Sequence, residues 1–160
     1  MQNMTASEYL VEVLGGPSVF KGRTVPTSTE LRERIKQGLP FRSLESVRER
    51  LRLSVPEAAT VLHMPIRTMA RRRHTRKLDP VESDRLYRIA RVAAEAVSVF
   101  GAEDIATTWL QRPNRALNGE LPIRLLDTDS QPLFRHRIII GLDALVARDA
   151  ITSSTSEDRS

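Results

Sequence analysis

Three short polar signatures, each suited to start a helix, constrain the fold of this chain more than any other feature. In each one a capping side chain is followed three positions later by Glu, so the two side chains can satisfy each other's backbone N–H groups. The pairs are Thr27 and Glu30, Ser54 and Glu57, and Asp79 and Glu82. Gly38 and Gly101 then stand where glycine commonly ends a helix. The pattern predicts an all-α fold.

Apolar residues recur at helical spacing between these signals and predict the individual helices. The expected helices fall within 1–14, at 28–37, 44–52, 55–62, 65–73, 80–100, 102–110 and 132–151. Residues 15–29 are rich in Gly, Pro and hydroxyl side chains and indicate a linker. Only 4% of the residues are aromatic, which favours a helical core of Leu, Ile, Val and Ala over a strand-rich fold.

We expect four parts along the chain. They are an N-terminal arm and linker helix (1–40), a helix-turn-helix domain (41–101), a small helical domain (102–151) and a disordered polar tail (152–160). The chain has no Cys, which excludes disulfides and Cys-based metal sites. The N-terminus lacks the pattern of a secretory signal, and no apolar run approaches the length of a membrane span. These features predict a cytoplasmic protein without a membrane partner.

Positive charge is concentrated in residues 66–77, IRTMARRRHTRK, which contain six Arg or Lys residues and no acid. On composition alone, such a run is most often a solvated helix face, and this remains the competing interpretation. Its context favours DNA instead. A short helix at 55–62, a tight connection at His63 and a second short helix at 65–73 follow the order of a helix-turn-helix.

The expected packing of this motif defines a candidate DNA-binding face. Ala59 is the expected small contact between the helices, with Leu62, Met64 and Met69 facing inward. Arg suits guanine because its fork matches the O6 and N7 acceptors, whereas flanking basic residues suit phosphates. The predicted DNA-binding residues are Arg67, Thr68, Arg71, Arg72, Arg73, Arg76 and Lys77.

Several segments match a known family in order. They are IKQGLPFRSLESVRERL at 35–51, IRTMARRR at 66–73, LDPVESDRLYRIARV at 78–92 and VFGAEDIATTWLQRPNRALNGELPIRLLDT at 99–128. Together they make the chain, from about residue 31 to 130, resemble the Xre/MbcA/ParS family of antitoxins. In that resemblance 66–73 corresponds to the recognition helix and 99–128 to the C-terminal toxin-binding domain.

The resemblance implies an antitoxin of a type II toxin–antitoxin system that binds DNA as a homodimer and represses its own operon. Its partners would be operator DNA, to which it would bind at the nucleoid, and a RES-domain toxin encoded by the adjacent gene. That toxin would consume NAD+, either by degrading it or by ADP-ribosylating a target. The antitoxin would cover the toxin's NAD+ pocket with its C-terminal region.

The expected toxin-binding region, about 126–151, departs from the family pattern because Ser130-Gln-Pro replaces a Gly. We therefore assign it only regionally. Its candidate residues are Leu126, Phe134, Arg135, Arg137, Ile138, Ile139, Ile140 and Leu142. The three adjacent Ile residues face either a partner or the core of their own domain. The two Arg residues face either an acidic or phosphate-binding pocket or solvent. Trp109 is expected in the core, paired by helical spacing with Ile105.

No arrangement of residues indicates an enzyme, a metal site or a cofactor. The three His residues are scattered, and the chain has neither a Gly-rich phosphate loop nor a nucleophile elbow. Two other functions remain open. The chain is either a helix-turn-helix regulator whose C-terminal half serves dimerisation or sensing, or an interaction protein with an incidental basic helix.

Overall fold

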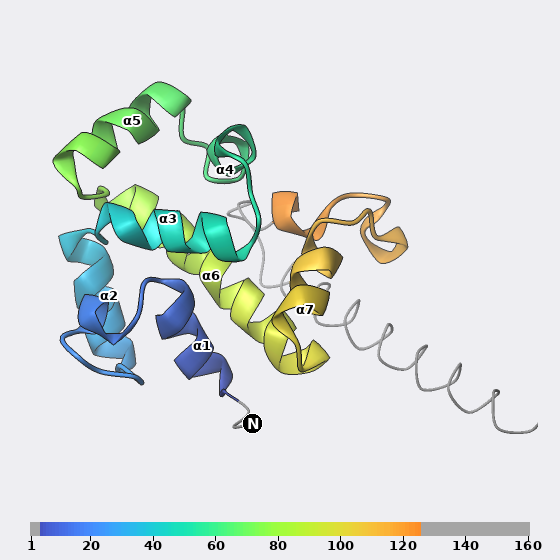
Figure 1. Cartoon of the computed structure of the whole chain (residues 1–160), viewed down its shortest axis with the longest axis horizontal. Coiled ribbons are helices and arrows are strands. Elements are labelled where there is room, and N and C mark those ends of the chain that lie inside the picture. Colours follow the sequence, from blue (N-terminus) through green and yellow to red (C-terminus); the bar gives the residue numbers. More distant parts are fainter. Residues whose placement is uncertain (1–3, 126–160) are drawn as a thin grey trace, which may run out of the picture.

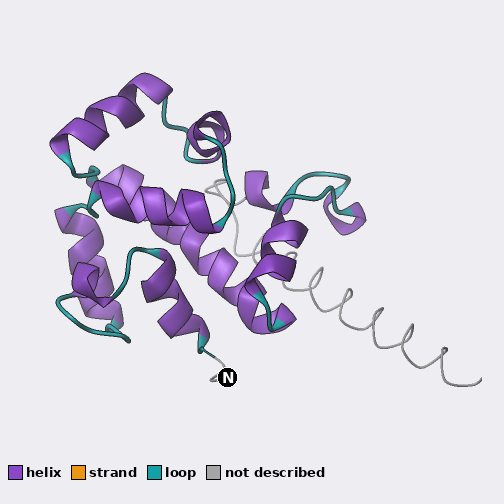
Figure 2. Ribbon diagram, in the orientation of Figure 1, coloured by secondary structure: helices purple, strands orange, loops and turns teal. Residues whose placement is uncertain are grey.

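The computed structural model describes residues 4–125, and within that range the chain is helical, without β-strands (Figure 1, Figure 2). This confirms the expected all-α fold. The α-helices are α1 (Ala6–Val13), α2 (Ser28–Gln37), α3 (Phe41–Arg50), α4 (Val55–Val61), α5 (Ile66–Thr75), α6 (Pro80–Phe100) and α7 (Glu103–Leu110). Three short 3-10 helices are η1 (Pro17–Phe20), η2 (Arg115–Leu117) and η3 (Pro122–Leu125).

Capping boxes start four of these helices, and all three pairs expected from the sequence are formed. At α4, for example, Ser54 N–H donates to Glu57 Oε2 at 2.7 Å and Glu57 N–H donates to Ser54 Oγ at 3.2 Å. The fourth box starts α1 and joins Thr5 to Glu8. These local bonds satisfy N–H groups that a helix start otherwise leaves unpaired.

Helix α6 is the centre of the fold, and α1, α2, α3 and α7 all pack against it (Figure 1). Its buried face combines Leu86 and Ile89 with Ala90, Ala93 and Ala94. The small Ala side chains allow neighbouring helices to approach closely, while Leu86 and Ile89 fill the spaces between them. Gly101 ends α6 in the left-handed conformation that the sequence pattern indicates.

The N-terminal residues belong to this same core. Val11, Val13 and Leu14 are buried, as are Val19 and Phe20 of η1. Residues 15–29, expected as a linker, therefore contain a packed turn. The Gly, Pro and hydroxyl residues of this segment correctly predict loop backbone. Val19 and Phe20 nevertheless have enough apolar surface to be buried in the core.

The segment between α2 and α3 is joined to the segment after α5. Phe41 N–H donates to the Arg76 carbonyl at 3.0 Å, and Leu78 N–H donates to the Leu39 carbonyl at 2.9 Å. The buried Ser83 hydroxyl accepts from Leu39 N–H at 2.8 Å. Gly38 has a φ of 88°, and a Cβ added there would overlap the Leu78 carbonyl oxygen. This position therefore requires glycine.

The C-terminal part of the described chain extends from the end of α6. Trp109 is buried as expected, and its ring centroid lies 5.9 Å from that of Phe100. Ile105, the expected partner of Trp109, is instead 51% exposed. Trp109 thus packs toward α6 through Phe100, whereas Ile105, one turn earlier on α7, is largely exposed. No helix within residues 4–125 is long and apolar enough to cross a membrane.

Candidate nucleic-acid interface

Helices α4 and α5 form the helix-turn-helix expected from the sequence. After α4 the chain turns at His63, whose φ of 47° places it in the left-handed region. Met64 N–H then donates to the Ala59 carbonyl at 2.9 Å, and Pro65 precedes the first residue of α5. His adopts this backbone conformation more readily than most residues other than Gly, Asn and Asp.

The interior of the motif contains the three apolar residues that the sequence predicts there. Leu62, Met64 and Met69 are buried, as expected. The most buried small residue of α4 is Ala58, which is 1% exposed, whereas Ala59 is only half-buried. Ala59 still packs against the core, and Ala58 is a second small side chain of α4 in the interior.

Helix α5 presents a basic face to solvent. Met69 is its one buried residue, and Arg67, Ala70, Arg71 and His74 are exposed. Arg67 and Arg71 are four residues apart and therefore lie on the same side of the helix. Within residues 4–125 neither guanidinium has an ion-pair partner. Thr68 is half-buried and lies at the edge of this face.

Arg72, also expected to contact DNA, is held by carboxylates of the same chain. Its Nη2 lies 2.9 Å from Asp79 Oδ2, and its Nε lies 2.8 Å from Glu82 Oε2. Asp79 and Glu82 also form the capping box of α6, so one pair of acids starts α6 and fixes α5. The Arg72 side chain is only 21% exposed. The structure therefore gives Arg72 a role in positioning the basic face.

The remaining predicted DNA-binding residues lie toward the end of α5. Arg73 is exposed, with its Nη2 3.6 Å from Glu45 Oε1 and its guanidinium carbon 5.8 Å from the centroid of the Phe41 ring. Arg76 ends α5 in the left-handed conformation, and both it and Lys77 are exposed. These three cations border the face that carries Arg67 and Arg71.

A polar cluster joins α1 and α3 to α7. The Tyr9 hydroxyl donates to Glu103 Oε1 at 2.9 Å, and the Arg50 guanidinium lies over the Tyr9 ring. Arg50 also pairs with Glu103 at 3.4 Å and with Glu12 at 3.8 Å. Burial raises the pKa of Tyr9 above its usual value, and the hydrogen bond to Glu103 adds to this. Glu103 thus connects α7 to both α1 and α3.

The expected toxin-binding residues lie outside the residues that the structure describes. They are Leu126, Phe134, Arg135, Arg137, Ile138, Ile139, Ile140 and Leu142. The expected helix at 132–151 lies outside them as well. Among the described residues, no three His, Asp or Glu side chains are grouped so that they could hold a metal ion.

Comparison with known proteins agrees with this geometry. Residues 30–91 match the antitoxin Xre-like helix-turn-helix domain, and residues 95–133 match the antitoxin Xre/MbcA/ParS C-terminal toxin-binding domain. An antitoxin Xre of Yersinia enterocolitica is 33% identical over 116 residues, which are 70% of this chain and 77% of the relative. The chain belongs to the Xre antitoxin family.

Two further members of the Xre antitoxin family are similar over most of the same region. One, from Pseudomonas putida, is 34% identical over 100 residues, which are 62% of each chain. The other, from Photorhabdus laumondii, is 32% identical over 101 residues, which are 62% of this chain and 68% of the relative. Both carry the name antitoxin Xre. A helix-turn-helix domain followed by a toxin-binding domain supports a type II antitoxin and a non-catalytic role for this Xre protein.

Proposed function

We propose that this Xre protein binds operator DNA by placing α5 in the major groove. The supporting observation is the pair of exposed guanidiniums on one face of α5, Arg67 and Arg71, which have no ion-pair partner within residues 4–125. Recognition helices read base edges with their N-terminal residues. The guanidinium group of Arg can donate two hydrogen bonds at once to the O6 and N7 atoms of guanine. Thr68 adds a hydroxyl at the edge of the same face.

The bordering cations hold the DNA backbone in this proposal. Arg73, Arg76 and Lys77 contact phosphates, which supplies affinity and salt dependence without sequence preference. Arg72 does not contact DNA in this proposal. Its two ion pairs with Asp79 and Glu82 fix the angle at which α5 presents its basic face. We further propose that the protein binds as a homodimer and represses its own operon.

The toxin that the protein neutralises is proposed to be a RES-domain enzyme that consumes NAD+, encoded by the adjacent gene. The match of residues 95–133 to a toxin-binding domain supports a toxin partner. The RES identity follows from the family resemblance. Residues 126–151 are proposed to cover the toxin's active site.

The DNA-binding proposal is tested by comparing two Arg substitutions on specific and random duplexes. Arg71→Ala is expected to lower affinity for the operator by about 1–3 kcal/mol while changing affinity for random DNA little. Arg76→Ala is expected to weaken binding to both duplexes and to flatten the salt dependence. Equal effects of Arg71→Ala on the two duplexes would show that Arg71 contacts no base.

The toxin proposal is tested in cells by inducing the adjacent reading frame with and without this chain. We expect NAD+ to fall on induction and to recover when the antitoxin is co-expressed. A variant lacking residues 129–160 is expected to bind DNA normally but to leave NAD+ depleted. If NAD+ does not change on induction, the RES assignment is wrong, and if the truncated chain restores NAD+, the toxin contacts lie elsewhere.

A further inference from the structure

The end of α5 lies beside the first turn of α3, and a side-chain hydrogen bond joins α3 to η1. Helix α5 ends at Arg76 and is followed by Lys77. The Arg76 carbonyl accepts from the N–H of Phe41, the first residue of α3, at 3.0 Å. The next residue of α3 is Arg42, which is exposed. The end of α5 and the first turn of α3 are therefore adjacent.

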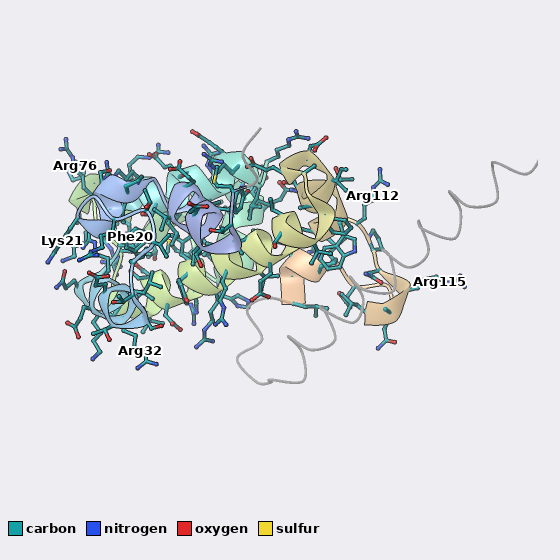
Figure 3. All side chains as sticks on the ribbon, turned by 90° about the horizontal axis from the view of Figure 1, so that it is seen from below. Phe20, Lys21, Arg32, Arg76, Arg112 and Arg115 are labelled. Carbon is teal, nitrogen blue, oxygen red and sulfur yellow. The ribbon has the colours of Figure 1, made fainter. Side chains whose placement is uncertain are left out.

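Residue Arg42 connects this junction to the N-terminal region. Its Nη2 donates to the hydroxyl of Ser18, in η1, at 2.9 Å. Lys21 directly follows η1, is exposed, and donates its backbone N–H to the Pro17 carbonyl. Figure 3 shows Lys21 and Arg76 at the same end of the molecule, far from Arg112 and Arg115 at the other end.

Carboxylates near this junction are already paired with other cations. Glu45 lies 3.6 Å from Arg73, Glu30 lies 2.9 Å from Arg23, and Glu33 lies 4.0 Å from Lys36. Within residues 4–125, no ion pair joins Lys21, Arg42, Arg76 or Lys77 to an acid. Lys21 lies near Glu30, and its charge helps to lower the pKa of that carboxyl. Each of these three carboxylates has another cation as its ion-pair partner, so the junction keeps an excess of positive charge, as a surface that binds phosphates requires.

We propose that Lys21, Arg42, Arg76 and Lys77 form one flanking surface that holds backbone phosphates of the DNA beside the groove read by α5. This inference rests on the proposed DNA binding and extends it to η1 and to the start of α3. Residue Lys21 precedes both matched domains, which begin at residues 30 and 95. The N-terminal region thus serves DNA binding as well as the core.

The backbone at Lys21 allows its charge to be tested separately from its fold. Lys21 has a φ of 54°, a conformation that Asn adopts at lower cost than Lys. We therefore expect Lys21→Asn to be no less stable than the wild type in thermal unfolding. Arg42→Gln removes the second charge and keeps a polar side chain, although the shorter Gln does not reach Ser18 as Arg42 Nη2 does.

The experiment measures binding of the full chain to two duplexes as a function of salt. One duplex is the region upstream of the chain's own gene, and the other is a random sequence of the same length. Each phosphate contact contributes about 0.9 to the slope of log affinity against log salt. The double variant Lys21→Asn, Arg42→Gln is expected to lose about 1.8 from that slope on both duplexes.

The matched control is Arg112→Gln, Arg115→Gln, which makes the same change in net charge at the opposite end of the molecule (Figure 3). It is expected to leave the slope unchanged. An unchanged slope in the double variant, or an equal loss in the control, would overturn the flanking surface. If Arg42→Gln perturbs the fold, Lys21→Asn alone is expected to lose about 0.9, and no loss would likewise overturn it.

Failure of this inference is distinguishable from failure of DNA binding itself. If the wild type binds neither duplex, both proposals are wrong. If the wild type prefers its own upstream region and Arg71→Ala abolishes that preference while the double variant keeps the wild-type slope, only the flanking surface is wrong.

Discussion

Helices α5 and α6 are neighbours in the chain but are held in the fold in opposite ways. Helix α6 buries eight of its residues, including Leu86 and Ile89, which are 0% and 1% exposed. Helix α5 buries only Met69. Apolar burial along one whole side therefore fixes α6, whereas α5 keeps most of its surface open to a partner.

Directional bonds replace the missing apolar contacts of α5. Arg72 reaches Asp79 and Glu82, and the Arg76 carbonyl accepts from Phe41 N–H. A helix of ten residues is marginal by itself, so these attachments decide whether α5 is presented at a fixed angle. A helix can thus be fixed through a few polar bonds while its outer face stays exposed.

The largest effect is expected from Leu86→Ala, which removes apolar burial from α6. Truncating a fully buried Leu leaves a cavity and costs about 2–5 kcal/mol in the free energy of unfolding. Chemical denaturation measures this loss. Arg71→Ala on α5 is the contrasting variant and is expected to change stability by less than about 0.5 kcal/mol. Similar losses in the two variants would contradict the distinction between the helices.

Next in size is Gly38→Ala, which disturbs the junction at the end of α5. Alanine at a φ of 88° carries backbone strain of roughly 1–3 kcal/mol, and its Cβ would also overlap the Leu78 carbonyl oxygen. We expect lower thermal stability together with weaker DNA binding. Gly22→Ala is a matched control for strain, because its φ is 83° but no atom lies within 4 Å of an added Cβ. Equal losses would show that the overlap is unimportant.

A smaller loss of stability is expected from Arg72→Ala, which removes the polar attachment of α5. Breaking a half-buried ion pair leaves Glu82, which is 8% exposed, without its cation and costs roughly 1–3 kcal/mol. Both specific and random DNA binding should weaken, since the whole face loses its orientation. Arg71→Ala should instead keep stability and lose specificity. If Arg72→Ala is as stable as the wild type, α5 is held by other contacts.

The smallest effect is expected from Tyr9→Phe. This substitution keeps the buried ring of α1 but removes its hydrogen bond to Glu103 of α7. Losing the hydrogen bond to Glu103 costs about 1 kcal/mol at neutral pH. The pKa of Tyr9 is higher in the folded protein than in the unfolded chain. The protonated hydroxyl therefore contributes fully to the free energy of unfolding below the usual Tyr pKa, about 10, and this contribution is lost as pH rises beyond it. Stability of the wild type should therefore approach that of the variant above about pH 10. A constant difference across pH would contradict this.

Local signals in the sequence predicted much of the fold. The capping boxes of α2, α4 and α6 lie where the sequence places them, because such a box involves only residues three positions apart. The left-handed turn at His63 and the buried Met69 also follow from local spacing. The all-α class and the helix-turn-helix were thus accessible without the structure.

Features that depend on distant residues were not predicted. The sequence shows Arg72 as one of three consecutive Arg residues, and only the path of α6 reveals that Asp79 and Glu82 hold it. The exposure of Ile105 depends on which side of α7 meets α6. The DNA-binding residues and the domain limits remain predictions, and the toxin-binding residues lie outside the described chain.

The backbone bridge between residues 39–41 and 76–78 makes the intervening segment a closed loop. Helices α3, α4 and α5 therefore lie between two points that backbone hydrogen bonds hold together. If α5 reads DNA as proposed, its exposed residues can change while both ends of the segment stay joined to the same core.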